Sequence, residues 1–241
     1  MKPAPKRIYQ AVAVSPSGDA FVVTLDGCPV KTPASAVLAV PTAALAEALA
    51  GEWDAQGDVI RPTTMPLTRL CATTIDRIGP QCHAVIDNLV SYGSMDLVCY
   101  RAEQPPDLRA RQHDQWQPLL AWLEDRYEAR LAVTDGIMPV AQDGHALDIL
   151  RQSVAALGDF PLAALASAVE ALGSLVIGLA LLADRVGPEE AFAASQVDED
   201  YQRERWGEDA EAAERRRRLL EDVVQAARLD RLTRGSSAGA P

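Results

Sequence analysis

The sequence lacks the short motifs by which many enzymes hold phosphates or metals. Its 241 residues contain no GxxxxGK[ST] phosphate loop, no GxGxxG dinucleotide motif and no HExxH pair. These absences give no support to an ATP-driven mechanism, and we expect neither a bound nucleotide nor another cofactor. A long apolar run is also missing, because the most apolar stretch, residues 171–183, is shorter than the ~20 residues that cross a bilayer core. We therefore expect no membrane insertion and a buried helix in this stretch.

Cysteine and histidine are scarce and scattered. None of the four cysteines lies in a CxxC pair or at metal-ligand spacing from one of the three histidines. We therefore expect no metal site and predict buried, reduced thiols, as is usual for a protein of the cytosol. The cysteines are Cys28, Cys71, Cys82 and Cys99.

Basic and aromatic residues are both in deficit. The chain has 23 Lys and Arg against 34 Asp and Glu, for a net charge of −11. A surface this acidic repels phosphate backbones and anionic lipids, so we expect no nucleic-acid partner. Aromatic residues make up 5% of the chain, whereas hydrophobic residues reach 48% and are mostly alanine and leucine. This mixture favours packed helices over an all-β fold.

Short β-like segments fill the first forty residues. The Asp26-Gly27 pair between two of them is a strong signal of a two-residue hairpin. Tight turns between successive segments predict an antiparallel meander with one face that needs a cover. The segments are residues 8–14, 21–25, 29–32 and 37–40.

A helix is expected over residues 42–56, with Thr42 as its N-cap. Leu45, Leu49 and Trp53 recur every four residues and form an apolar stripe that can cover the sheet. This pattern favours a core position for Trp53. A tryptophan near the end of a helix can also be an exposed anchor for a partner.

Residues 57–66 contain two prolines and provide the best domain boundary. The sequence beyond them is mostly helical and includes predicted helices at about 188–206 and 208–232. We therefore predict an α+β fold, in which an N-terminal antiparallel β meander covered by a helix precedes a mainly α-helical domain. The predicted segments are domains at 1–62 and 63–233 and a disordered tail at 234–241.

The densest polar feature is the segment of residues 195–209, which contains three consecutive carboxylates at 198–200. One interpretation is a solvated acidic face with an aromatic anchor in the core. The other is an acidic surface for a partner, with Tyr201 and Trp206 as contact residues at its edge. The candidate partner-binding residues are Asp198, Glu199, Tyr201, Trp206 and, on the earlier helix, Trp53.

Two other functions stay open on these residues. A carboxylate-based, metal-dependent hydrolase would use Asp198, Glu199 and His113, and it predicts a bound divalent metal. A small-molecule binding module between two domains is the third possibility. A general base needs an orienting partner that the isolated His113 does not show in the sequence, so we assign no catalytic residue.

Six strings along the chain resemble, in order, those of one known family. Each string is weak alone, but six in order from about residue 7 to residue 210 form a specific signal. Together they resemble the ATP-twelve family of ATP synthase assembly chaperones. The strings are DGCPVKTP at 26–33, EWDAQ at 52–56, MPLTRL at 65–70, LVCYRA at 97–102, GIMP at 136–139 and the segment 195–207.

The resemblance implies a function that composition did not show. Members of the family assist assembly of the catalytic sector of F-type ATP synthase. They bind the free α subunit and shield the surface that later meets the β subunits, without a nucleotide cycle, so the resemblance implies a chaperone and not an enzyme. Its motifs single out Trp53 and Asp198, where aspartate replaces the more usual glutamate. The first seven residues resemble neither a secretory signal nor a transit peptide, so we expect a cytoplasmic protein of a bacterium.

Overall fold

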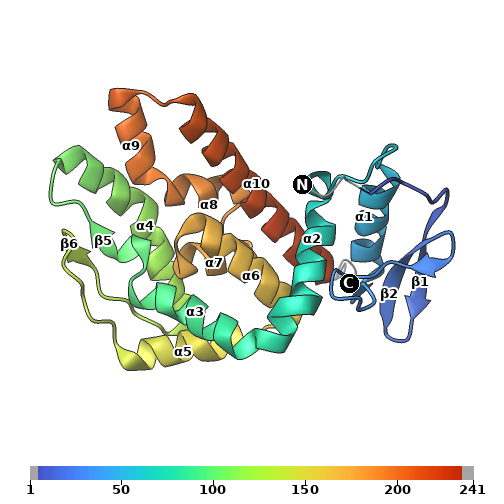
Figure 1. Ribbon diagram of the computed structural model, residues 1–241. Helices are drawn as coiled ribbons and strands as arrows, with labels where there is room; N and C mark the ends of the chain where they lie inside the picture. The colour runs from blue at the N-terminus through green and yellow to red at the C-terminus, as the bar shows by residue number, and fades with distance from the viewer. Residues whose placement is uncertain (1–4, 235–241) are drawn as a thin grey trace, which may run out of the picture. The chain divides into compact units, whose positions relative to one another are not determined.

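A computed structural model of the protein describes residues 5–234 (Figure 1). Apart from Arg234, the predicted disordered tail lies outside the described residues. The described chain forms two compact units, and the predicted α+β fold class is confirmed. The first unit comprises residues 5–82, 159–164 and 228–234, and the second comprises residues 83–158 and 165–227.

A small antiparallel sheet forms one side of the first unit. Strand β2 (Ala20–Leu25) lies in its centre, with β1 (Val12–Ser17) along one edge. The predicted hairpin after β2 is confirmed, since Asp26 and Gly27 both have positive φ angles, 49° and 83°.

The predicted meander is confirmed, but its last strand makes an additional pairing that was not predicted. Strand β3 (Cys28–Pro29) pairs only with the last two residues of β2, which leaves the beginning of β2 available. Strand β4 (Ala39–Val40) returns to pair there with Phe21 and Val22. The fourth predicted segment thus pairs with the third at a single bridge between Lys31 and Val37, and its strand β4 also pairs with the second.

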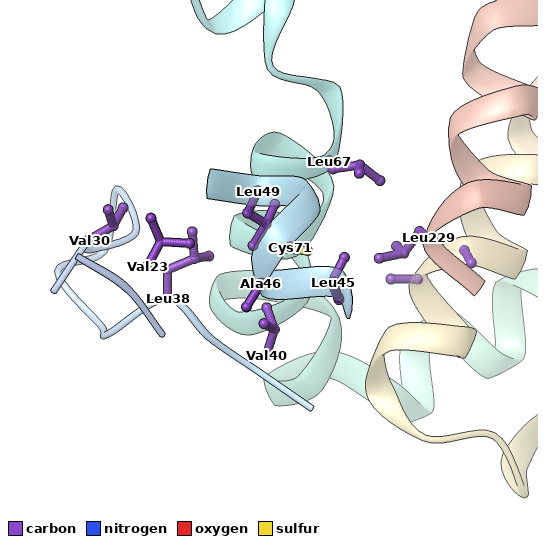
Figure 2. Close-up of a cluster of buried hydrophobic side chains, with 12 residues drawn as sticks. Val23, Val30, Leu38, Val40, Leu45, Ala46, Leu49, Leu67, Cys71 and Leu229 are labelled. Carbon is purple, nitrogen blue, oxygen red and sulfur yellow. The ribbon is translucent and has the colours of Figure 1, made fainter. Parts of the chain in front are cut away.

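Helix α1 (Ala43–Asp54) packs against β1 and β2, as the apolar stripe predicts (Figure 1). The Thr42 hydroxyl accepts a hydrogen bond from the Leu45 backbone N–H at 3.2 Å, which confirms the predicted N-cap. Leu45 and Leu49 are completely buried. Each such leucine contributes about 1.5–3 kcal/mol on burial. Figure 2 shows the cluster that they form with Val23, Val30, Leu38, Val40, Ala46, Leu67, Cys71, Ala163, Ala164 and Leu229.

Glu52 links α1 to helix α2 (Pro66–Thr73). Its two carboxylate oxygens accept hydrogen bonds from the backbone N–H groups of Leu67 and Thr68, each at 2.8 Å. These N–H groups have no partner within their own helix, and the negative charge complements the positive end of the helix dipole. The strings EWDAQ and MPLTRL are therefore joined by a helix cap.

Replacing Glu52 by alanine is expected to lower the free energy of unfolding by about 1–2 kcal/mol, as the loss of a helix cap does. Urea titration monitored by circular dichroism measures this change. Glu47→Ala is the matched control, because Glu47 lies on the same helix and is exposed. Equal stabilities of the two variants would contradict the capping role of Glu52.

Short helical segments lie on both sides of α2. Segment η1 (Pro62–Thr64) precedes it, and the π-helical η2 (Thr74–Ile78) and η3 (Gly79–Gln81) continue from it. The boundary between the two compact units falls after Cys82, whereas the sequence suggested residue 62. As a statement about independently folding domains, the boundary at residue 62 stays a prediction.

The second unit is mainly helical, with one two-stranded parallel ladder between β5 and β6. Helices α6 and α10 contribute residues to both units. The elements are α3 (Cys82–Ser94), η4 (Leu97–Cys99), β5 (Tyr100–Arg101), α4 (Pro106–Tyr127), β6 (Thr134–Asp135), α5 (Gly144–Ala155), α6 (Asp159–Leu172), α7 (Leu175–Leu182), α8 (Pro188–Ser195), α9 (Val197–Trp206) and α10 (Ala210–Thr233).

Helix α7 is the buried helix expected from the most apolar stretch, and every residue from Leu175 to Leu181 is buried. It approaches α6 so closely that a Cβ atom on Gly178 would lie 2.7 Å from a methyl carbon of Val169. No helix among residues 5–234 is long and apolar enough to cross a membrane.

The cysteine prediction is only partly confirmed. Cys71 and Cys99 are buried, and burial raises the pKa of the Cys99 thiol to about 12. Cys28 is exposed, because it lies on the short β3 strand directly after the hairpin turn.

Candidate functional site

The predicted acidic helix is divided in two. The sequence predicted one helix over 188–206, but Gln196 leaves the helical conformation, with φ −111° and ψ 18°, and separates α8 from α9. The candidate residues of this region therefore lie on α9, a helix of 10 residues that packs against α4 within the second unit (Figure 1).

The Asp198 side chain is half-buried and faces α4. Its Oδ1 atom accepts a hydrogen bond from Gln112 Nε2 at 2.7 Å. Gln112 is itself 2% exposed, and its Oε1 atom accepts from the Ala102 backbone N–H at 2.7 Å. The carboxylate is thus fixed by a chain of hydrogen bonds that begins at the backbone beyond β5.

Tyr201, one turn further along α9, is also turned inward and is only 3% exposed. Its hydroxyl donates to Asp107 Oδ1 at 2.8 Å, while Arg205 pairs with the other carboxylate oxygen at 2.9 Å. These hydrogen bonds, with that of Arg205 the largest, hold the pKa of Asp107 below its usual value. The guanidinium carbon of Arg205 lies 3.6 Å from the centre of the Tyr201 ring. Tyr201 is therefore a packing residue within this chain, as the interpretation with an aromatic anchor in the core expected, and a contact between Tyr201 and a partner stays a prediction.

Glu199 and Trp206 lie on the outer side of α9 and line a groove of about 820 Å³ between α9 and α10. The Glu199 side chain makes no hydrogen bond or ion pair to another described residue, and Trp206 is 76% exposed. The groove is lined by Leu97, Glu170, Ala171, Leu172, Gly173, Ser195, Gln196, Glu199, Gln202, Arg203, Trp206, Gly207, Glu208, Asp209, Glu211, Ala212, Arg215, Arg216, Arg218 and Leu219.

Ion pairs within the second unit hold α9 and α10 together. Arg216 on α10 makes two contacts with the Asp200 carboxylate, the longer at 3.2 Å. Arg203 lies 3.3 Å from Asp200 and 3.9 Å from Glu208. Asp200 takes up these basic side chains, and the neighbouring Glu199 carboxylate forms no ion pair with another described residue, although Arg215 and Arg218 also line the groove.

Trp53 lies on α1 in the first unit. Its backbone carbonyl accepts a hydrogen bond from the Tyr9 hydroxyl at 2.7 Å, and the two rings meet edge to face at 5.9 Å. The ring is half-buried against the core of this unit, and its Nε1 atom is enclosed without a hydrogen-bond partner among the described residues. This placement matches the core position that its spacing favoured, and a contact between Trp53 and a partner stays a prediction.

The arrangement of the described side chains does not support the alternative of a metal-dependent hydrolase. Among residues 5–234, no group of three or more His, Cys, Asp or Glu side chains is arranged to hold a metal ion. His113 is exposed on α4, next to the buried Gln112 to which Asp198 is bonded. The described residues therefore do not assemble Asp198, Glu199 and His113 into a metal centre.

The α4 residues that hold α9 were not predictable from the sequence. Gln112 and Asp107 lie 86 and 94 positions before their partners, Asp198 and Tyr201. Asp107 is in the first turn of α4, where a carboxylate is explained locally by the helix dipole. The residues around Asp107 do not show whether its carboxylate only complements the helix dipole or also contacts α9.

Comparison with known proteins identifies the family. The family model described as ATP12 chaperone protein matches residues 6–124. The crystal structure of Atp12 from Paracoccus denitrificans is 39% identical, with a TM-score of 0.92, over 95% of this chain and 98% of that chain. The chain belongs to the ATP12 chaperone family. The family resemblance drawn from the six ordered strings is thereby confirmed.

Other relatives of this ATP12-family protein agree. The mitochondrial protein atp12 of Schizosaccharomyces pombe is 24% identical over 218 residues, which are 86% of this chain and 75% of that protein. A protein of Agrobacterium tumefaciens is 39% identical, with a TM-score of 0.89, over 96% of this chain and 87% of that chain. Membership makes the protein a chaperone of F-type ATP synthase assembly.

Proposed function

We propose that this ATP12-family chaperone binds the free α subunit of the F-type ATP synthase catalytic sector and shields its subunit interface until assembly. It acts in the bacterial cytoplasm, without ATP and without catalysing a reaction. The observation that carries the proposal is the outer side of α9, where the 76% exposed Trp206 and the unpaired Glu199 line the same groove.

This surface combines the two properties that a binding site for an unassembled subunit needs. Exposed apolar patches on a free subunit aggregate unless another protein covers them. A tryptophan supplies a large apolar contact, and such residues often dominate the binding energy of an interface. Negative charge beside it guides association and selects the partner, while remaining weak enough for later release.

Asp198 and Tyr201 act behind this surface. Their side chains bond to Gln112 and Asp107 on α4, and these bonds set the rotation of α9 that turns Glu199 and Trp206 outward. We therefore assign Asp198 a positioning role in partner binding. Trp53 remains a second proposed contact, on the first unit.

Wild-type protein mixed with purified α subunit at equimolar ratio is expected to suppress the aggregation of α in a light-scattering assay without nucleotide. Asp198→Lys is expected to lose most of this protection, because lysine removes the acceptor for Gln112 and brings a second donor to the same place. Unchanged turbidity with wild-type protein would contradict the chaperone function for α.

Asp198→Asn is the matched control, since its amide oxygen can still accept from Gln112. Protection by the asparagine variant supports positioning, whereas its loss shows that the charge itself binds α. Trp206→Ala is expected to weaken binding by about 2 kcal/mol, as for a central interface tryptophan. Its melting temperature should not change, because the ring is exposed.

A further inference from the structure

A second exposed feature of the second unit is the loop that follows β6. Ile137 is 93% exposed and Met138 is 73% exposed, and both belong to the GIMP string. Val133, just before β6, is 43% exposed. Large apolar side chains at such exposure contribute nothing to the stability of their own chain, so their presence together on one loop needs another explanation.

The two ends of this loop are fixed to the second unit. Before it, Leu131 is 6% exposed and anchors the chain in the core. The backbone N–H of Ala132 donates to Gln142 Oε1 at 2.7 Å, and Gln142 Nε2 donates to the Ala132 carbonyl at 3.0 Å. This pair of hydrogen bonds closes the base of the loop and limits how far its tip can fold back.

Gly136 directs the tip into solvent. Its φ angle is +79°, and its backbone N–H donates to the Arg101 carbonyl at the end of β5, at 2.8 Å. A side chain at this positive φ would be strained, so the position favours glycine, and a Cβ atom would also displace the Glu103 carboxylate. The backbone conformation of this chain thus explains the glycine of the GIMP string. No contact within the described residues explains the exposed apolar side chains of Ile137 and Met138.

Unpaired carboxylates predominate in the chain around the tip, although Arg130 precedes the loop. Residues 131–148 contain three aspartates and no lysine or arginine. Asp135 pairs with Arg109 at 2.7 Å, but Glu103, Asp143 and Asp148 are exposed and form no ion pair with another described residue. An apolar tip inside an acidic border fits an apolar patch with lysine or arginine at its edge, and it repels an anionic lipid surface.

We propose that the loop of residues 133–140 is a second docking element for the client of this chaperone, the unassembled α subunit, and that it inserts Ile137 and Met138 into an apolar patch with a basic border. This inference rests on the proposed function. Because the loop is fixed before binding, little conformational entropy is lost when the client covers it. The loop supplies apolar contact, and the groove on α9 supplies a separate, charged contact.

The test is the affinity of purified α subunit for the double variant Ile137→Ser with Met138→Ser, measured by biolayer interferometry. Loss of two buried apolar side chains is expected to raise Kd at least about tenfold. Glu103→Lys is expected to slow association and to weaken its dependence on salt. Met95→Ser is the matched control, because Met95 is 66% exposed in the same unit but outside the loop, and it should bind as wild type does.

The outcomes separate the two proposals. If the wild type binds α and the double variant binds it with equal affinity, the proposal of a docking loop is overturned and the proposed function is left intact. No binding of α by the wild type overturns both. Sedimentation that shows a wild-type dimer and a monomeric double variant would make the loop a contact between copies and would also overturn the inference. All variants should keep the wild-type melting temperature, because the changed side chains are exposed.

Discussion

Replacing Trp116 by alanine is expected to lower the free energy of unfolding by about 3–5 kcal/mol, the usual loss for a large buried aromatic side chain. Trp116 lies on α4 and is 1% exposed. Its Nε1 atom donates to the Ala194 carbonyl at the end of α8, at 2.7 Å. The guanidinium carbon of Arg101, a residue that is 5% exposed, lies 5.0 Å from the centre of its ring. The variant therefore loses packing, a hydrogen bond and the contact of a buried cation.

Chemical denaturation of the full-length variant measures this loss. Trp116→Phe keeps most of the ring but removes the donor, and it should lose about 1–2 kcal/mol because the Ala194 carbonyl is left without its partner. Trp206→Ala is the matched control, since the same substitution at an exposed position should leave stability unchanged. A Trp116→Ala variant as stable as Trp206→Ala would show that the α4–α8 contact is not a main support of the second unit.

Asp96 is expected to make the stability of the protein depend on pH. It is completely buried and accepts hydrogen bonds from the Ser174 hydroxyl at 2.5 Å and from the backbone N–H groups of Val176 and Val98. It thereby caps both η4 and α7. Burial raises the pKa of this carboxyl from 3.8 to about 6, against the opposite effect of its hydrogen bonds.

The sign of the pH effect follows from this shift. Between about pH 4 and pH 6 the folded protein keeps the Asp96 proton while the unfolded chain has lost it, so the folded state binds more protons. The free energy of unfolding therefore falls as pH rises through this window. A shift of about two pKa units corresponds to about 3 kcal/mol, at about 1.4 kcal/mol per unit. The extra stability is fully present below about pH 4 and is lost above about pH 6.

Asp96→Asn removes the titration and should abolish this slope. The variant also places an amide donor against the N–H groups that Asp96 caps, so it should be less stable than wild type, most clearly near pH 4.5. Urea titrations of both proteins from pH 4.5 to pH 7.5 measure the difference. Asp148→Asn is the control, because that carboxylate is exposed. A difference between wild type and Asp96→Asn that stays constant with pH would contradict this role of Asp96.

The elements of the first unit that are determined by residues adjacent in the sequence were predictable. The Asp26-Gly27 hairpin requires two positive φ angles at neighbouring positions. The Thr42 cap requires a hydroxyl three residues before Leu45, whose backbone N–H donates to it. The pairing of β4 with β2 was not predictable, because it depends on how far β3 extends along β2. The break at Gln196 was missed for a related reason, since the residues on both sides of it favour helix.

The sequence by itself determined the family, the α+β class and the segment that carries the candidate site. Ordered strings, turn residues and helical periodicity are local properties, because each depends only on residues that are close together in the sequence. Only the tertiary structure decided which side of α9 faces outward. Asp198 and Tyr201 find their partners Gln112 and Asp107 more than 80 residues earlier, and the backbone N–H of Gly136 donates to the Arg101 carbonyl, 35 residues earlier, beside the loop tip at Ile137. A helix pattern shows that two faces exist, but burial of one face depends on side chains that the pattern does not contain.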